Sequence, residues 1–245
     1  MGLNSFAALI SDPYERAARL YPALLALLPL LIVLAVTSVF SKPLVTQLLT
    51  LSGACGAAYL VANISRMLGK AREEKMFAKW GGVPTTQLLR HRSAFIDPHT
   101  KQRYHSFLAR KLKICFPTRD EEHASPEAAD ELYRAGAKWL LERTRDKKRF
   151  ALLFKENISY GFHRNGFGLK WFGTLLGFGA TVWLVIAFHA DVPENWSALP
   201  TDQIATLGVE VAITIAWASY FNEYRLKQAA RAYADMLLRT CDSLR

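Results

Sequence analysis

The sequence predicts an all-α membrane protein, in which a four-helix transmembrane bundle carries an inserted cytoplasmic α-helical domain and a C-terminal cytoplasmic helix. Three observations predict this fold class. Four runs of the chain are apolar enough to cross a bilayer. Residues 66–170, between the second and third run, carry 23 Lys and Arg against 12 Asp and Glu, in a chain whose net charge is +10. No part of the sequence alternates apolar and polar residues as a half-buried strand does.

The predicted spans follow the uncharged runs, with one acid in the last of them. A hydrocarbon core of about 30 Å takes about twenty helical residues, so the two later runs are short but sufficient. The loop at 41–43 holds one Lys and the loop at 189–203 holds no Lys or Arg. The positive-inside rule therefore predicts that both termini and the basic block face the cytoplasm. The spans are residues 21–40, 44–64, 171–188 and 204–221.

The polar block reads as a series of helices. Residues 66–80 extend the second span until Gly81, Gly82 and Pro84 end the helix, and Thr85 or Thr86 is the expected cap of the next one. Apolar residues at spacings of four predict an amphipathic helix over about 99–114. Two further helices are expected over 126–144 and 149–158. The predicted domains are a terminal segment at 1–20, a transmembrane hairpin at 21–64, a basic sensor at 65–170, spans three and four at 171–221, and a C-terminal helix at 222–245.

The C-terminal run contains no helix breaker and carries an apolar stripe at heptad-like spacing. One interpretation is packing against the protein's own cytoplasmic domain. The other is self-association of this helix below a pore. The stripe consists of Leu226, Ala230, Tyr233, Leu237, Cys241 and Leu244.

The sequence contains no recognisable catalytic or metal-binding motif. The three cysteines and six histidines show no metal-ligand spacing, and no Ser/His/Asp arrangement, phosphate loop or dinucleotide fingerprint is present. We therefore predict no catalytic residue, no metal, no cofactor and no enzymatic activity.

The fourth span is the most polar of the four. Glu210 costs a few kcal/mol at the centre of a bilayer, and such carboxylates usually face a protein interior or water. In an oligomer a ring of them would attract cations, which predicts a pore lining. The alternative is a protonated or hydrogen-bonded acid near the outer interface. The residues on this helical face are Thr206, Glu210, Thr214 and Trp217.

The basic block is the second candidate site. Arginine forms bidentate contacts with phosphate, and Tyr and Trp stack on bases. A nucleotide-like ligand is one interpretation of this excess positive charge. A solvated face, or one that rests on anionic lipid head groups, is the alternative. The predicted ligand-binding residues are Trp80, Arg90, Arg92, Arg103, Tyr104, Lys155 and Arg164.

The segment at 157–173 precedes the third span and is rich in Gly and aromatic residues. Its aromatic and basic end suits an interfacial anchor. Gly161, Gly166 and Gly168 permit non-helical backbone, so we expect a turn or hinge that couples the basic domain to the span.

The arrangement of these parts resembles a known class of proteins. A transmembrane hairpin is followed by a basic helical domain with the sequences KWGGVPTTQLLRHR and DPHTKQRYH, then by ENISYGFHRNGFGLK, two more spans and a polar helix. This is similar to the four-span effectors encoded beside nucleotidyltransferases in bacterial anti-phage defence, among them the Hailong-type membrane effectors and the four-span effectors of cyclic-oligonucleotide systems.

The resemblance implies a homo-oligomeric ion channel, a tetramer, in the inner membrane. Its ligand would be a nucleotide derivative made by the partner nucleotidyltransferase. In the Hailong-type case an oligodeoxyadenylate holds the channel shut, and in the cyclic-oligonucleotide case the ligand opens it. No functional residue of that class is placed on this chain by the resemblance.

Overall fold

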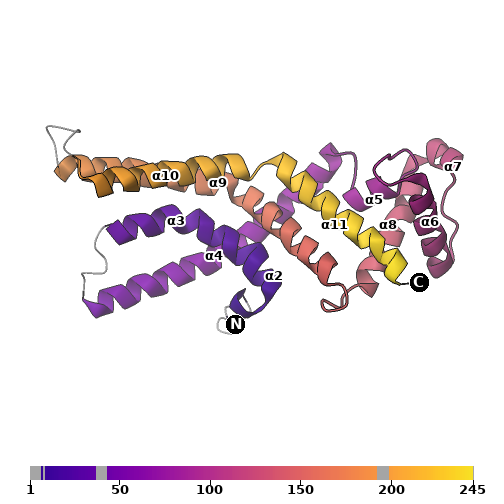
Figure 1. Cartoon of the computed structure of the whole chain (residues 1–245), viewed down its shortest axis with the longest axis horizontal. Helices are drawn as coiled ribbons and strands as arrows, with labels where there is room; N and C mark the ends of the chain where they lie inside the picture. Colours follow the sequence, from indigo (N-terminus) through magenta and orange to yellow (C-terminus); the bar gives the residue numbers. More distant parts are fainter. Residues whose placement is uncertain (1–6, 8, 37–42, 192–198, 245) are drawn as a thin grey trace. The chain divides into compact units, whose positions relative to one another are not determined.

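The computed structural model of the chain describes residue 7 and residues 9–36, 43–191 and 199–244. All the regular secondary structure within these ranges is helical, as Figure 1 shows. The prediction of an all-α fold is therefore confirmed. In chain order the helices are α2 (Pro13–Glu15), η1 (Arg16–Leu20), α3 (Tyr21–Val36), α4 (Leu44–Lys79), α5 (Pro84–Leu89), α6 (Pro98–Leu112), α7 (Arg119–Ala124), α8 (Pro126–Arg143), α9 (Ala151–Asp191), α10 (Thr201–Tyr220) and α11 (Glu223–Ser243).

The chain divides into two compact units. We call the first the membrane unit, which comprises Met1–Arg72 and Gly161–Leu226. We call the second the basic unit, which comprises Glu73–Tyr160 and Lys227–Arg245. The basic unit therefore ends earlier than the predicted sensor at 65–170, and it includes most of α11.

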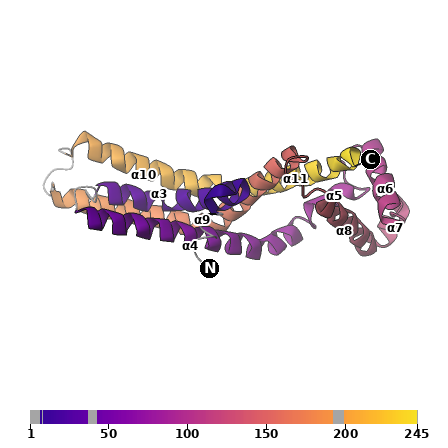
Figure 2. The same ribbon diagram turned by 90° about the horizontal axis from the view of Figure 1, so that it is seen from below.

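The core of the membrane unit is formed by α3, α4, α9 and α10, which run alongside one another in Figure 2. Ala23 and Ala26 of α3 and Ala62 of α4 are fully buried, and small side chains at these positions let the helices approach closely. Larger residues fill the space beside them, with Leu169 of α9 and Trp217 of α10 in the same cluster.

Within the described residues, two helices are long and apolar enough to cross a membrane. They are Pro13–Val36, with 24 residues, and Ala151–His189, with 39 residues. Helices α10 and α11 form a pair bent by 56°, which would add a third span if the pair counts as one. The predicted spans at 21–40 and 171–188 thus coincide with candidate spans, although residues 37–40 and the predicted loop at 41–42 lie outside the described ranges. The span at 44–64, and with it the four-span bundle, remains a prediction.

Helix α9 corrects the sequence interpretation of residues 157–173. It is one continuous helix from Ala151 to Asp191, so the predicted non-helical turn at Gly161, Gly166 and Gly168 is wrong, and so is the predicted end at 158. Among the described glycines only Gly81 and Gly82 have positive φ.

The three glycines of α9 serve helix contact instead. A Cβ at Gly168 would lie 2.7 Å from the backbone nitrogen of Gly69 in α4, and one at Gly161 would lie 2.8 Å from the Cβ of Ala18. A Cβ at Gly166 would overlap the ring of Phe221. Glycine at these sites therefore allows close packing of the helices within the membrane unit, a common use of small residues.

The core of the basic unit confirms the predicted amphipathic patterns. Tyr104 and Leu108 of α6 and Leu140 of α8 are buried in one cluster. Helix α6 begins after the Asp97 cap and α8 spans the predicted range nearly residue for residue. The break after α4 is also confirmed, because Gly81 and Gly82 have φ of 87° and 123°.

Two further expectations are settled in this unit. The N-cap of α5 is Val83, with Pro84 at the first helical position, so the cap predicted at Thr85 or Thr86 is wrong. In α11, Leu237 and Cys241 are buried in the core of the basic unit. The apolar stripe of this helix thus packs on its own chain, as the first of the two interpretations predicts.

Candidate functional site

An irregular loop at residues 90–93, between α5 and α6, is held from two sides by buried charged groups. The carboxylate of Glu122, on α7, accepts hydrogen bonds from the backbone N–H of His91 at 2.7 Å and of Arg92 at 3.5 Å. The ammonium of Lys101, on α6, donates to the carbonyl oxygens of Arg90 at 2.7 Å and Ser93 at 2.5 Å. Both side chains belong to residues that are only 4% exposed. Hydrogen bonds to charged groups are among the stronger ones in proteins, so the loop is well fixed.

The electrostatics of the two groups fit this arrangement. Burial acts to raise the pKa of Glu122, but hydrogen bonds from the Tyr133 hydroxyl and the two backbone N–H groups outweigh it and hold the pKa below its ordinary value. Burial lowers the pKa of Lys101, an effect that the charge of Glu122 opposes. The loop is thus held between the carboxylate of Glu122 and the ammonium of Lys101, whose residues are both buried.

A cavity of about 450 Å³ lies over this loop. We call it the loop cavity. Its polar lining includes His91, Arg92, Lys101, Gln102 and Arg119, and no Asp or Glu is found among the described residues that line it. Arg92 and Arg119 are exposed, and neither guanidinium makes a hydrogen bond or ion pair within the described part of the chain.

A second cavity, of about 420 Å³, has three carboxylates and two guanidinium groups in its lining. Arg103 lines it and donates to both carboxylate oxygens of Asp242, each at 3.0 Å. Asp97 and Asp235 add two more carboxylates to its lining. An anion would meet these acids, so the loop cavity is the stronger candidate for an anionic ligand.

The structure does not bring the predicted ligand-binding residues together. Trp80 and Tyr104 are buried, so neither ring is available to stack on a base. Arg90 donates to Asp130 at 2.8 and 2.5 Å and serves to join α5 to α8. Of the predicted set, only Arg92 lines the loop cavity.

The remaining members of that set lie elsewhere. Arg103 is paired with Asp242, as described above. Lys155 is exposed on α9. Arg164 belongs to the membrane unit, where it is 7% exposed and its Nε donates to Asn165 Oδ1 at 3.2 Å. Sequence reasoning missed Gln102 and Arg119, because an exposed Gln and an Arg at a helix start carry no local signal of a site.

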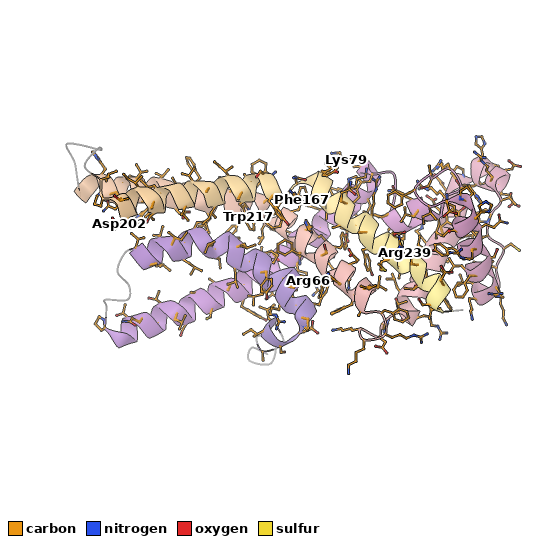
Figure 3. The ribbon with its side chains drawn as sticks, viewed as in Figure 1. Arg66, Lys79, Phe167, Asp202, Trp217 and Arg239 are labelled. Carbon is orange, nitrogen blue, oxygen red and sulfur yellow. The ribbon has the colours of Figure 1, made fainter. Side chains whose placement is uncertain are left out.

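The predicted pore stripe lies on α10 of the membrane unit, between Asp202 and Trp217, which Figure 3 labels near its two ends. Glu210 is fully buried, and neither carboxylate oxygen has a hydrogen-bond partner among the described residues. Thr206 is half-buried, and its hydroxyl donates to the carbonyl oxygen of Asp202 at 2.7 Å. The stripe therefore combines a half-buried threonine with a carboxylate that has no hydrogen-bond donor among the described residues.

The lower part of the stripe packs against α9. The indole N–H of Trp217 donates to the carbonyl of Lys170 at 2.9 Å. A Cβ at Gly173 would overlap the Trp217 ring, and one at Gly177 would overlap Thr214. The two glycines thus form the contact at which α9 receives these side chains.

Comparisons with protein-family models, with curated proteins and with solved structures found no match to this chain. The functional argument therefore rests on the chemistry of the two regions described above.

A buried histidine gives the basic unit a testable response to acid. His105 stacks on Tyr133 and its Nε2 lies 2.8 Å from the carbonyl oxygen of Leu89. Burial is the main reason that its pKa falls from 6.5 to about 4, with the charges of His91 and Lys101 acting in the same direction. The folded protein therefore holds this ring neutral at pH values where the unfolded chain protonates it.

The sign of the effect follows from that difference. The contribution to stability is complete above pH 6.5 and is lost as the pH falls toward 4, and it amounts to about 3 kcal/mol. We expect the urea midpoint of the full chain in detergent to fall between pH 7 and 4.5, and to fall less for His105→Phe. His99→Gln, which removes an exposed histidine, is the control. An equal fall in the wild type and His105→Phe would contradict this prediction.

Proposed function

We propose that the protein is an oligomeric membrane effector that forms a ligand-gated ion channel, which depolarises the bacterial inner membrane in anti-phage defence. A nucleotide or oligonucleotide bound by the basic unit controls it. The observation that carries the proposal is Glu210, a fully buried carboxylate without a donor in the described structure, on an apolar helix. Carboxylates within membrane helices are costly, about 2.5–3.5 kcal/mol on insertion scales, and usually mark a path for ions or substrate.

The channel requires several copies of the chain, and we propose a tetramer. In the state described here Glu210 is buried within one chain, which we take as the closed state. Opening turns α10 so that the carboxylates of the copies face a common axis, where a ring of them attracts cations. Such a movement would withdraw Trp217 and Thr214 from the contact at Gly173 and Gly177 and break the hydrogen bond from Trp217 to Lys170.

The basic unit is the proposed sensor, on the cytoplasmic side with both termini. Arg92 and Arg119, which have no carboxylate partner among the described residues, favour an anionic ligand, and the proposal requires no cofactor or catalytic group. Helices α4 and α9 each contribute residues to both units, so they are the proposed route from ligand to channel. The segment of α9 that contains Gly161 and Arg164 then couples the basic unit to the membrane unit as part of one continuous helix.

The alternative is a non-conducting membrane scaffold that recruits an anionic partner through its basic unit. One observation favours it. Trp217 and Thr214 already make hydrogen bonds within a single chain, to the carbonyls of Lys170 and Glu210. Because these two polar groups are already hydrogen-bonded within the chain, they do not require contact with water in a pore.

Substitution of Glu210 separates the two functions. In liposomes that contain the purified oligomer, we expect Glu210→Gln to lower potassium flux by about tenfold, the factor that corresponds to about 1.4 kcal/mol of lost attraction for the ion. Asp202→Asn is the matched control, because it removes the same charge from an exposed position in the first turn of α10. If the wild type passes no more potassium than protein-free liposomes do, the scaffold is supported and the pore is contradicted. Equal, measurable flux through the wild type and both variants would show that Glu210 does not line the ion path.

A further inference from the structure

We propose that the loop cavity binds the phosphate groups of its ligand and distinguishes ligands by phosphate charge, with no contribution from the identity of a base. The inference deepens the proposed function, on which it rests for its biological role, because it assigns the site and the chemical class of the controlling ligand. The binding itself can be tested without any channel activity.

The first support is the pairing of the arginines. Arg90 is bound to Asp130 and Arg103 to Asp242, so their charges are neutralised within the chain. Arg92 and Arg119 line the loop cavity without a carboxylate partner in the described structure. A guanidinium presents paired donors that match two phosphate oxygens, so two unpaired ones at a single cavity suit a multiply charged phosphate.

The second support is that the backbone segments that carry these two arginines are joined to each other. Arg119 opens α7, and the same short helix carries Glu122, whose carboxylate binds the backbone N–H groups of His91 and Arg92. The imidazole of His91 also lies within hydrogen-bond reach of the Pro117 carbonyl, with its Nε2 2.9 Å from that oxygen. The loop and the start of α7 are therefore joined twice.

Lys101 also holds the loop that carries Arg92. Its ammonium binds carbonyl oxygens on both sides of Arg92, those of Arg90, His91 and Ser93. Lys101 is thus a positioning residue whose own donors are occupied by the loop. A site that is rigid before binding loses less conformational entropy when the anion arrives, which favours affinity.

The third support is the absence of a stacking surface. The described lining of the loop cavity contains no Phe, Tyr or Trp. Trp80 and Tyr104, the aromatic members of the predicted set, are buried. Phe95 follows Ala94 in the sequence and is exposed, but it lines the second cavity and not this one. Proteins usually hold single-stranded nucleic acid by stacking on its bases and by attracting its charged backbone. This cavity offers only the attraction between its arginines and phosphate. Gln102 and Ser93 supply neutral groups beside the arginines.

The size of the cavity agrees with a small ligand. Small-molecule sites commonly enclose about 300–1,000 Å³, and the loop cavity measures about 450 Å³. A pyrophosphate, the phosphate chain of a nucleotide, or the phosphate of a lipid head group presents the same chemistry to the arginines. The experiment must therefore separate a soluble source from a lipid source.

The probe is sodium pyrophosphate, titrated calorimetrically into the full chain held in phosphatidylcholine nanodiscs. We expect the wild type to bind pyrophosphate. ATP and GTP should displace it at the same concentration, because they carry the same triphosphate chain. Arg92→Ala and Arg119→Ala should each weaken binding by about tenfold, and the double variant by about a hundredfold, as expected for charge-assisted hydrogen bonds. Arg110→Ala, an exposed arginine of the same helix as Lys101, is the matched control and should bind as the wild type does.

Three results would overturn the proposal: no binding of pyrophosphate by the wild type, equal loss in Arg110→Ala and the double variant, or a strong preference between ATP and GTP. Nanodiscs with added phosphatidylglycerol separate the sources. If anionic lipid displaces pyrophosphate, the lipid phosphate occupies the site, and if it does not, a soluble phosphate compound does. Binding without ion flux would keep this inference and contradict the channel, whereas flux without binding would do the reverse.

Discussion

Gly168→Val should prevent the membrane unit from reaching its native packing. A Cβ at this position would lie 2.7 Å from the backbone nitrogen of Gly69 and 3.1 Å from its Cα, so the obstacle is backbone that cannot rotate aside. The added side chain would also separate Arg72 from the carbonyls of Phe167 and Gly168, to which its guanidinium donates at 2.8 and 3.1 Å. Overpacking costs about 1–3 kcal/mol and occasionally more, and we expect a loss at or above about 3 kcal/mol here.

The measurement is the thermal midpoint of the purified chain in detergent, followed by tryptophan fluorescence. Gly179→Val is the matched control, because it makes the same substitution in the same helix at a position where no atom lies within 4 Å of the added Cβ. We expect this variant to melt close to the wild type. Equal destabilisation by the two substitutions would show that the loss comes from glycine in the helix and not from the contact with α4.

Lys101→Met should have the second largest effect, on the basic unit. Methionine keeps an unbranched side chain but removes the donor to the carbonyls of Arg90 and Ser93. It also leaves the buried carboxylate of Glu122 without the ammonium whose charge acts on it. Removal of one partner from a buried charged arrangement typically costs about 3–5 kcal/mol.

Urea unfolding of the full chain, read from the far-ultraviolet circular dichroism, measures this loss. Lys138→Met is the control, because Lys138 is exposed on α8. Surface substitutions of this kind usually change stability by less than about 0.5 kcal/mol. A loss for Lys101→Met within that range would contradict the role that we assign to Lys101 in holding the loop.

Periodic patterns made the basic unit the most predictable part of the chain. The spacing of Tyr104, Leu108 and Leu112 predicts α6, because apolar residues at intervals of four lie on one face of a helix and mark the face that will be buried. The glycines after α4 predict its end for the same local reason. The stripe of α11 was equally visible, but its partner was not, because the sequence does not tell which surface an apolar face will cover.

The segment at 157–173 could not be predicted from local sequence. Glycine usually weakens a helix, which suggests a turn at Gly161, Gly166 and Gly168. Tertiary contact overrides that preference, since Gly69, Ala18 and Phe221 occupy the space that side chains would need. These partners lie far from the segment in sequence, so only the folded structure identifies them.

The candidate site, too, could be predicted only in part, because its ion pairs join residues that are far apart in the sequence. Composition located the excess positive charge, yet it could not show which arginines are neutralised. Arg90 is paired across 40 residues and Arg103 across 139 residues. These pairings leave Arg92 and Arg119 as the unpaired arginines of the loop cavity in the described chain.

Ion flux through the wild-type protein tests the central claim most directly. Liposomes loaded with potassium and carrying the purified oligomer are followed with a potential-sensitive dye, with and without pyrophosphate on the side of the basic unit. We predict a flux that changes when pyrophosphate is added, and that does not change in the Arg92→Ala, Arg119→Ala double variant. If the wild type passes no ions under either condition, the protein is not a channel gated from this cavity.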